Sequence, residues 1–325
     1  MADPKHISEE EAALYDRQLR LWGVAAQNRM LTSSVLVYKF KGVAAEVVKN
    51  VVLAGVGAVT LLDSNKVNQV DLGANFFLRQ QDVGKKRVEA GAPRVSALNP
   101  RVTLTTETDD ELLHDQDFIS QFNLVVLTDV DAPTVLRVNE LTRRLGKKLY
   151  VVSSIGMDGW IFADLLQHSF IIDTVNSTAP GETAKTTTKQ TQSYVSFEKA
   201  LAHSFSTMRP RQIRQTPDTL WAILSLFATQ RASPSQDITI ETIESASRSL
   251  LPTIAIRIEL LSSSTLSRII ECINTEFSPC SAILGGLAGQ DVLNILGEKE
   301  QAIRNFCLFD GHTCSGNVYQ LGLDS

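Results

Sequence analysis

Residues 33–63 read SSVLVYKFKGVAAEVVKNVVLAGVGAVTLLD, and the fold class follows from this stretch. Its first seven residues have strand length and an apolar centre, Val35-Leu-Val-Tyr38, which predicts a buried strand. The middle predicts a helix, because Val43, Val47 and Val51 fall on a shared face. The run VTLLD predicts a second strand that ends at Asp63. A strand, a helix and a strand in this order predict a right-handed parallel βαβ unit.

The same alternation continues beyond this stretch. Further strands are predicted from RVTLTTE, NLVVLTD and KKLYVVSS, at residues 101–107, 123–129 and 147–154. The segment Asp131-Ala-Pro133 indicates a helix start, with Asp131 as N-cap and Pro133 in the first turn. The predicted fold class is therefore α/β, with a Rossmann-like, mainly parallel sheet and flanking helices.

The second half of the chain has a different pattern. Residues 159–173, GWIFADLLQHSFIID, alternate and predict an antiparallel extension. Residues 174–194 are polar and rich in threonine, which indicates a flexible linker or mobile loop. Residues 197–270 are mostly helical patterns interrupted by prolines. These features predict a partly helical half-domain inserted in the second half.

The chain therefore divides into two predicted parts. Residues 8–155 and 270–322 form the Rossmann-like domain, and residues 156–269 form the helical half-domain with the linker inside it. The first part opens with a helix, since Ser8 and Glu11 have the spacing of a capping box.

Charge and hydropathy exclude several classes of protein. The 325 residues carry a net charge of −5, which argues against a protein that coats nucleic acid. No stretch is expected to form a membrane span of about 18 apolar residues. The charged opening MADPKHISEEEAALYDR lacks the apolar region of a signal peptide.

The cysteines indicate reduced thiols. Cysteine occurs only at Cys272, Cys280, Cys307 and Cys314. A disulfide framework is not expected at this density, and a cytosolic or nuclear protein is indicated. No Cys-x-x-Cys pair occurs, so the usual spacing of a zinc site is absent and no metal site is predicted.

The loop after the first strand raises the question of nucleotide binding. In dinucleotide and ATP folds this loop is rich in glycine, so that backbone N–H groups reach phosphate. Here it contains Lys39, Phe40 and Lys41 before a single Gly42, while Asp63 lies 21 residues later, where a carboxylate can bond a ribose hydroxyl. Two interpretations remain open: the lysines bind phosphate by charge, or the cradle is degenerate. A hydride-transfer enzyme is not indicated, because the glycine turn it needs is missing.

Five blocks of sequence carry a resemblance to one family. They are YDRQLRLWG at residues 15–23, Asp82-Val-Gly-Lys85, Asp131 with Asn139, FSPCSAILGGLAGQDV at residues 277–292, and Phe309-Asp-Gly311. Each block is a weak signal, but their order along the chain is specific. Over most of residues 8–320 the chain resembles the enzymes that activate ubiquitin-like modifiers, and the resemblance is weakest from about 174 to 265.

The resemblance implies a pair of adenylation domains, one active and one degenerate. The active one binds ATP and magnesium, adenylates the modifier and passes it to a cysteine as a thioester. In this chain Gly73 and Ala74 stand where the active domain keeps an asparagine and an arginine, and Arg87 stands at its lysine position. Asp63 and Asp131 are retained. No cysteine precedes Cys272, although the family's catalytic cysteine lies in an earlier insertion.

These departures imply that the chain is the partner without catalytic groups. Its length and closing sequence resemble the smaller subunits of the SUMO-activating branch, and the equivalent neddylation subunit is much longer. The implied partners are a larger catalytic subunit, in an obligate heterodimer, and SUMO. ATP and magnesium would be bound by the partner and none by this chain alone, and the implied location is the nucleus and also the cytoplasm. No nucleic acid or membrane partner is expected.

The resemblance assigns one chemical role. In the family, the first arginine of the Tyr-Asp-Arg-Gln segment reaches into the partner's ATP site, and here that residue is Arg17. Arg17 is thus the predicted catalytic and cofactor-binding residue, acting in trans. Arg20 is interpreted as structural. Residues 282–289, rich in alanine and glycine, are expected to pack either against the partner or inside this domain.

The regulatory subunit of the neddylation-activating enzyme remains an alternative despite its greater length. Two functions of other classes also stay open at this point. One is a self-sufficient adenylating enzyme of the sulfur-carrier type, which needs an intact glycine loop and the arginine replaced by Ala74. The other is a free-standing nucleotide-sensing scaffold that uses Lys39 and Lys41.

Overall fold

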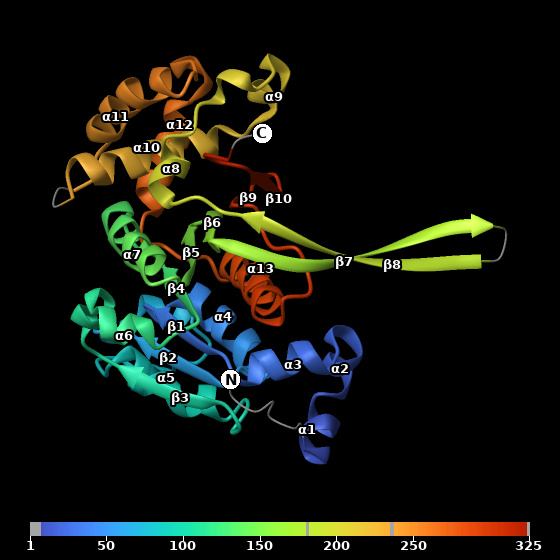
Figure 1. The fold of residues 1–325 in the computed structure, drawn as a ribbon. Coiled ribbons are helices and arrows are strands. Elements are labelled where there is room, and N and C mark those ends of the chain that lie inside the picture. Colours follow the sequence, from blue (N-terminus) through green and yellow to red (C-terminus); the bar gives the residue numbers. More distant parts are fainter. Residues whose placement is uncertain (1–7, 180–181, 235–236, 324–325) are drawn as a thin grey trace.

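The structure is a computed structural model, and it describes residues 8–179, 182–234 and 237–323. Its centre is an eight-stranded sheet with the order β10-β9-β6-β5-β4-β1-β2-β3 (Figure 1). The strands are β1 (Ser34–Tyr38), β2 (Ala58–Leu62), β3 (Thr103–Glu107), β4 (Leu124–Thr128), β5 (Lys148–Ile155), β6 (Asp158–Asp164), β9 (Phe306–Asp310) and β10 (Ser315–Tyr319). The predicted α/β fold class is confirmed.

The first five strands are parallel to one another. β1 pairs with β2 on one side and with β4 on the other. The chain thus leaves β1 toward β2 and β3, and later returns to β4 and β5 on the opposite side. The loops after β1 and β4 diverge at this point, which is where open α/β sheets place their ligands.

The sheet continues with antiparallel strands. β6 pairs with β5 and with β9, and β9 pairs with β10. The antiparallel extension predicted for residues 159–173 is therefore present, and its first part, β6, lies inside the large sheet. The proposed boundary between domains at residue 155 falls just before this strand.

Helices cover both faces of the sheet. On one face lie α3 (Val24–Leu31), α4 (Gly42–Leu53), α5 (Arg87–Ser96) and α13 (Ser278–Gly297). On the other lie α6 (Gln116–Ser120) and α7 (Ala132–Arg144), with the helical half-domain. Side chains of β1 alternate between these cores: Val35 and Val37 belong to the first, Leu36 and Tyr38 to the second.

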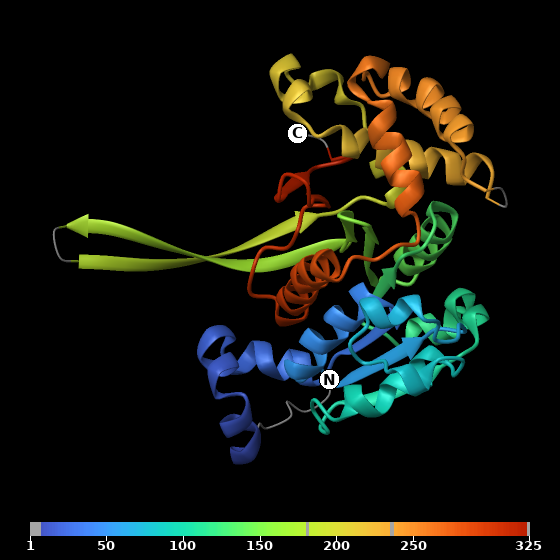
Figure 2. The ribbon, with the colours of Figure 1, turned by 180° about the vertical axis from the view of Figure 1, so that it is seen from behind.

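The helical half-domain packs on the second face (Figures 1 and 2). It comprises α8 (Phe197–Leu201), α9 (Pro210–Gln215), α10 (Asp218–Ala232), α11 (Ile240–Thr253) and α12 (Ser263–Cys272). Phe197 of α8 and Trp221 of α10 belong to the same continuous apolar core as Val125 of β4. Short 3₁₀ helices are η1 (Val70–Gly73), η2 (Gln80–Asp82), η3 (Asp110–His114), η4 (Phe205–Thr207) and η5 (Ile258–Leu260).

Residues 174–194 differ from the linker expected of them. Most of them form a long antiparallel hairpin, which comprises β7 (Gln167–Ala179) and β8 (Glu182–Ser193) and projects from the molecule (Figure 2). Polar, threonine-rich sequence lacks the apolar alternation from which strands are predicted, but threonine is a good strand former when a partner strand is available. The partner here is the next strand of the same hairpin, paired antiparallel from Gln167↔Ser193 to Ala179↔Glu182.

α13 is a core helix. Within the described part of the chain it is the one helix long and apolar enough to cross a membrane, contrary to the expectation from composition. The apolar stretch of this helix is 67% buried in the fold, and the helix packs along α4. The hydropathy therefore reflects burial between α4 and the sheet.

Candidate functional site

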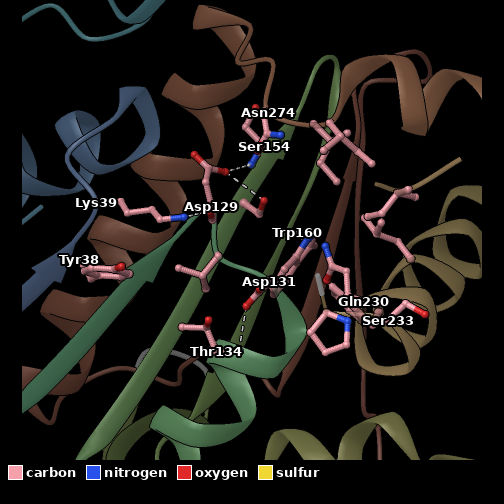
Figure 3. Close-up of a pocket in the computed structure, with 18 residues that line it drawn as sticks. Tyr38, Lys39, Asp129, Asp131, Thr134, Ser154, Trp160, Gln230, Ser233 and Asn274 are labelled. Atoms are coloured by element: carbon pink, nitrogen blue, oxygen red, sulfur yellow. Dashed lines mark hydrogen bonds between the residues drawn. The ribbon is translucent and has the colours of Figure 1, made fainter. Parts of the chain in front are cut away.

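A pocket lies where the loops after β1 and β4 diverge (Figure 3). Its volume is about 330 Å³, within the range of small-molecule sites. Lys39 and Asp129 come from the loops after the two strands, Ser154 from β5 and Gln230 from α10. The pocket therefore lies between the carboxyl edge of the sheet and the helical half-domain.

Asp129 is the centre of the polar groups at this edge. Its side chain is 7% exposed, and Oδ1 accepts hydrogen bonds from Ser153 Oγ at 3.0 Å and from the Ser154 N–H at 3.1 Å. Lys39 Nζ donates to the Asp129 carbonyl oxygen at 2.9 Å, and Lys41 Nζ lies 3.7 Å from Oδ2. Burial, above all, lowers the pKa of Lys39. Both lysines considered as phosphate ligands are thus held by this chain's own groups.

Asp63, the predicted ribose ligand, is fully buried, and its carboxylate is already bonded to groups of this chain. It accepts hydrogen bonds from the Phe40 N–H at 2.8 Å and the Asn65 N–H at 3.0 Å, and it forms a buried ion pair with Arg87. Arg87 also pairs with Asp71, with Nε 3.2 Å from Oδ2. The arginine at the family's lysine position is therefore part of an internal ion-pair cluster.

The glycine loop is replaced by a packed one. Phe40 is fully buried, and a Cβ at Gly91 of α5 would lie 2.4 Å from its ring, so glycine is needed inside that helix. Asn75 Nδ2 donates to the Phe40 carbonyl oxygen at 2.8 Å. A Cβ at Gly42 would lie 2.5 Å from Cβ of Ala74. Side chains fill the space beside the loop, where a glycine-rich loop would leave backbone N–H groups open to phosphate.

The remaining motif residues have local structural contacts. Asp131 caps α7 by accepting from the Thr134 N–H at 2.9 Å, as predicted. Asn139 Nδ2 donates to Asp164 at 2.7 Å, and its Oδ1 accepts from the Phe197 N–H of the helical half-domain at 2.7 Å. Within residues 8–179, 182–234 and 237–323, no group of three His, Cys, Asp or Glu residues is placed to hold a metal ion.

Arg17 lies away from this pocket. It is an exposed residue of α2 (Asp16–Trp22), which follows α1 (Glu9–Leu14), and it is not among the residues that line the pocket. In the described ranges it has no ion pair, whereas Arg20 pairs with Asp16, with Nη2 3.1 Å from Oδ2. The roles of the two arginines stay predictions.

The segment around Arg17 is anchored by its neighbour. Tyr15 is 1% exposed, and its hydroxyl accepts a hydrogen bond from Asn99 Nδ2 at 2.9 Å. A Cβ at Gly55 would lie 2.4 Å from that hydroxyl oxygen, so the tyrosine fits closely against the end of α4. Beyond it, Leu21 and Val24 are 62% and 58% exposed. Leu21 lies one turn after Arg17 on α2 and Val24 begins α3 (Val24–Leu31), so exposed apolar residues follow Arg17 along the chain.

The small-residue helix α13 has two different sides. Gly285 and Gly289 pack on α4, because added Cβ atoms would lie 2.4 Å from Glu46 Cβ and 2.9 Å from Asn50 Cβ. Ile283 and Leu287 are each 44% exposed, and Phe277, just before the helix, is 46% exposed. One side of residues 282–289 thus packs inside this domain, as one of the two expectations had it. The other side is an exposed apolar surface, and its packing against a partner stays a prediction.

Sequence reasoning missed Glu276. Its carboxylate accepts hydrogen bonds from the N–H groups of Gly42 and Val43, each at 3.0 Å. Desolvation is the main cause that raises the pKa of Glu276 to about 7, and the charge of Asp129 raises it further. The residues are 234 positions apart, and no local pattern links them.

The four cysteines are free thiols. Cys280 and Cys307 are buried, and burial raises the pKa of Cys280 and raises that of Cys307 to about 11. Cys272 is partly buried and Cys314 is exposed. The two buried thiols are poor nucleophiles because the thiolate is the reactive form.

The chain matches known proteins over nearly its whole length. A model of the ThiF family matches residues 15–321. DNA damage tolerance protein RHC31 of Saccharomyces cerevisiae is 32% identical, covering 97% of this chain and 98% of that protein. SUMO-activating enzyme subunit 1 of Rattus norvegicus is 32% identical over 97% of this chain and 96% of its own length, and that of Homo sapiens is 31% identical over the same shares.

A solved structure shares the fold. The crystal structure of PaaA superposes with a TM-score of 0.58 at 12% identity, covering 96% of this chain and 84% of that chain.

Proposed function

The chain belongs to the ThiF family, and we propose that it is the smaller, non-catalytic subunit of a SUMO-activating enzyme. The observation that carries the proposal is the packed loop after β1, in a chain with full-length relatives named SUMO-activating enzyme subunit 1. A subunit without a usable nucleotide cradle needs a partner that has one. The proposed partner is a larger catalytic subunit, and the proposed modifier is SUMO.

ATP and magnesium belong, in this proposal, to the partner. This is supported by the burial of Phe40 in the loop after β1 and by the pairing of Asp63 with Arg87, which leaves neither a glycine loop nor a free carboxylate for a ribose. The larger subunit would adenylate SUMO and form the thioester on its own cysteine. The same contacts disfavour a self-sufficient adenylating enzyme and a nucleotide-sensing scaffold based on Lys39 and Lys41.

The proposed contribution of this chain to chemistry is Arg17, delivered in trans to the partner's ATP. Support comes from its exposure, from the absence of an ion pair on it among the described residues, and from the buried Tyr15 that anchors the segment. A permanently charged, planar guanidinium suits a phosphate group. The exposed Leu21 and Val24 that follow it along the chain suit an interface that brings it to the partner.

We also propose a nuclear and cytoplasmic location. The free thiols of all four cysteines are in keeping with a reducing compartment. Imaging of the tagged full-length protein in its own cells tests this.

The isolated chain is expected to be inactive. Purified chain with SUMO should show only background ATP–pyrophosphate exchange, because the Asp63–Arg87 pair and Phe40 fill its own cradle. Addition of the larger subunit should restore exchange. Robust exchange by the chain alone would contradict the proposal.

None of the four cysteines is expected to carry SUMO. Cys280 and Cys307 are buried with raised pKa values, and no cysteine lies before residue 272. A variant with the exposed Cys314 and the partly buried Cys272 changed to Ser should still support the thioester on the partner, measured on non-reducing gels. Replacing the two buried cysteines can disturb packing. The thioester assay of Cys280→Ala and Cys307→Ala is therefore interpreted only for variants that still form the heterodimer in size-exclusion chromatography. Loss of the thioester with pairing intact would contradict the assignment.

A further inference from the structure

The carboxylate of Glu276 lies at the amino end of α4. Glu276 is in the segment between α12 and α13, and its side chain is 6% exposed. Its two oxygens accept from the Gly42 and Val43 N–H groups, one each, at 3.0 Å. Lys41 Nζ lies 4.0 Å from Oε2. The buried carboxyl group thus accepts hydrogen bonds from two backbone donors and has one ammonium group 4.0 Å away.

This arrangement is the one that sheets of this type offer to a phosphate. The first N–H groups of a helix have no partner within the helix, and the helix dipole favours an anion there. α4 has 12 residues and follows β1 at the point where the strand order reverses. The carboxylate therefore holds the position of a phosphate, with the same donors.

A buried carboxylate is a costly occupant of this position. Desolvation opposes its charge, and so does the carboxylate of Asp129, whose Oδ2 lies 3.7 Å from the same Lys41 Nζ. The neighbouring backbone makes a separate contact, in which the Thr275 carbonyl oxygen accepts from the N–H of Gly156, directly after β5, at 2.8 Å. The segment returning from the helical half-domain is thereby fastened to both β5 and α4.

We propose that Glu276 is a built-in anion that blocks a latent phosphate site and fastens the return segment of the helical half-domain to the sheet. The latent site consists of the Gly42 and Val43 N–H groups with the Lys41 ammonium group. Removal of the carboxylate leaves these donors free to bind an inorganic anion. The proposal concerns the degenerate loop itself, and it does not rest on the role in SUMO activation.

The test uses the full chain and inorganic phosphate. Wild type, Glu276→Ala and the matched control Glu271→Ala, an exposed glutamate five residues earlier, are titrated by calorimetry and by thermal unfolding at constant ionic strength with chloride. Glu276→Ala should bind phosphate at least about tenfold more tightly than wild type, because hydrogen bonds to a charged group are gained. Its melting temperature should rise with phosphate concentration and not with chloride. Wild type and Glu271→Ala should show neither effect.

Two further variants keep the result decisive. Lys41→Ala in the Glu276→Ala background should remove the response to phosphate. Glu276→Gln retains the volume and loses the charge, so it replaces Glu276→Ala if the latter does not fold, and it is judged by the same tenfold criterion. A folded variant that gives no response to phosphate, or a wild-type response equal to that of the variant, would overturn the proposal.

Discussion

Changing Arg17 to Ala should leave folding and pairing intact and reduce ATP–pyrophosphate exchange of the reconstituted heterodimer by orders of magnitude. By analogy with arginines that stabilise phosphoryl transfer in trans, the loss of exchange activity can reach roughly 10³–10⁵-fold. Folding should be unaffected because Arg17 is exposed and forms no ion pair in the described ranges. Exchange is measured with pairing checked by size-exclusion chromatography.

Two variants make this result specific. Arg17→Lys should restore activity only in part, since a single ammonium group cannot reproduce the planar two-pronged contact. Arg20→Ala removes an arginine three positions away, whose ion pair with Asp16 is exposed and so contributes little to stability. It should cost much less activity. Equal exchange by wild type and Arg17→Ala would leave this subunit with a scaffolding role only.

Changing Arg87 to Ala should destabilise the chain by about 3–5 kcal/mol, the usual cost of breaking a buried ion pair from one side. Arg87 is 5% exposed, and its removal leaves the buried carboxylates of Asp63 and Asp71 without their counter-ion. The loss is measured as a lower midpoint of urea unfolding at unchanged slope. The same region should become open to proteolysis because the loop after β1 depends on Asp63.

An exposed ion pair provides the comparison. Arg248→Ala breaks a pair with Glu244 on α11 in which the arginine side chain is 70% exposed. Such pairs contribute about 0–1 kcal/mol. If Arg87→Ala lowered stability no more than Arg248→Ala, the cluster around Asp63 would not be what holds the loop closed.

Local pattern predicted the parallel half of the fold. β1, β2, β4 and β5 lie within one or two residues of the strands predicted from apolar runs, and Asp131 caps α7 as its position indicated. These features depend on neighbours a few residues away, which a sequence displays directly. The hairpin β7–β8 was missed although its strands are neighbours in sequence, because its polar, threonine-rich residues lack the apolar alternation from which a strand is predicted.

The sequence by itself determined that the nucleotide loop is altered: Phe40 and two lysines stand where glycines are needed, and Arg17 remains in its motif as a prediction. Only the tertiary structure decided how the altered loop is stabilised. Asp63 is taken by Arg87, the lysines are held at Asp129, and the helix terminus is occupied by Glu276. Each of these contacts joins residues far apart in the chain, and buried charges and donors select their partners by proximity in the fold, which spacing along the sequence does not encode.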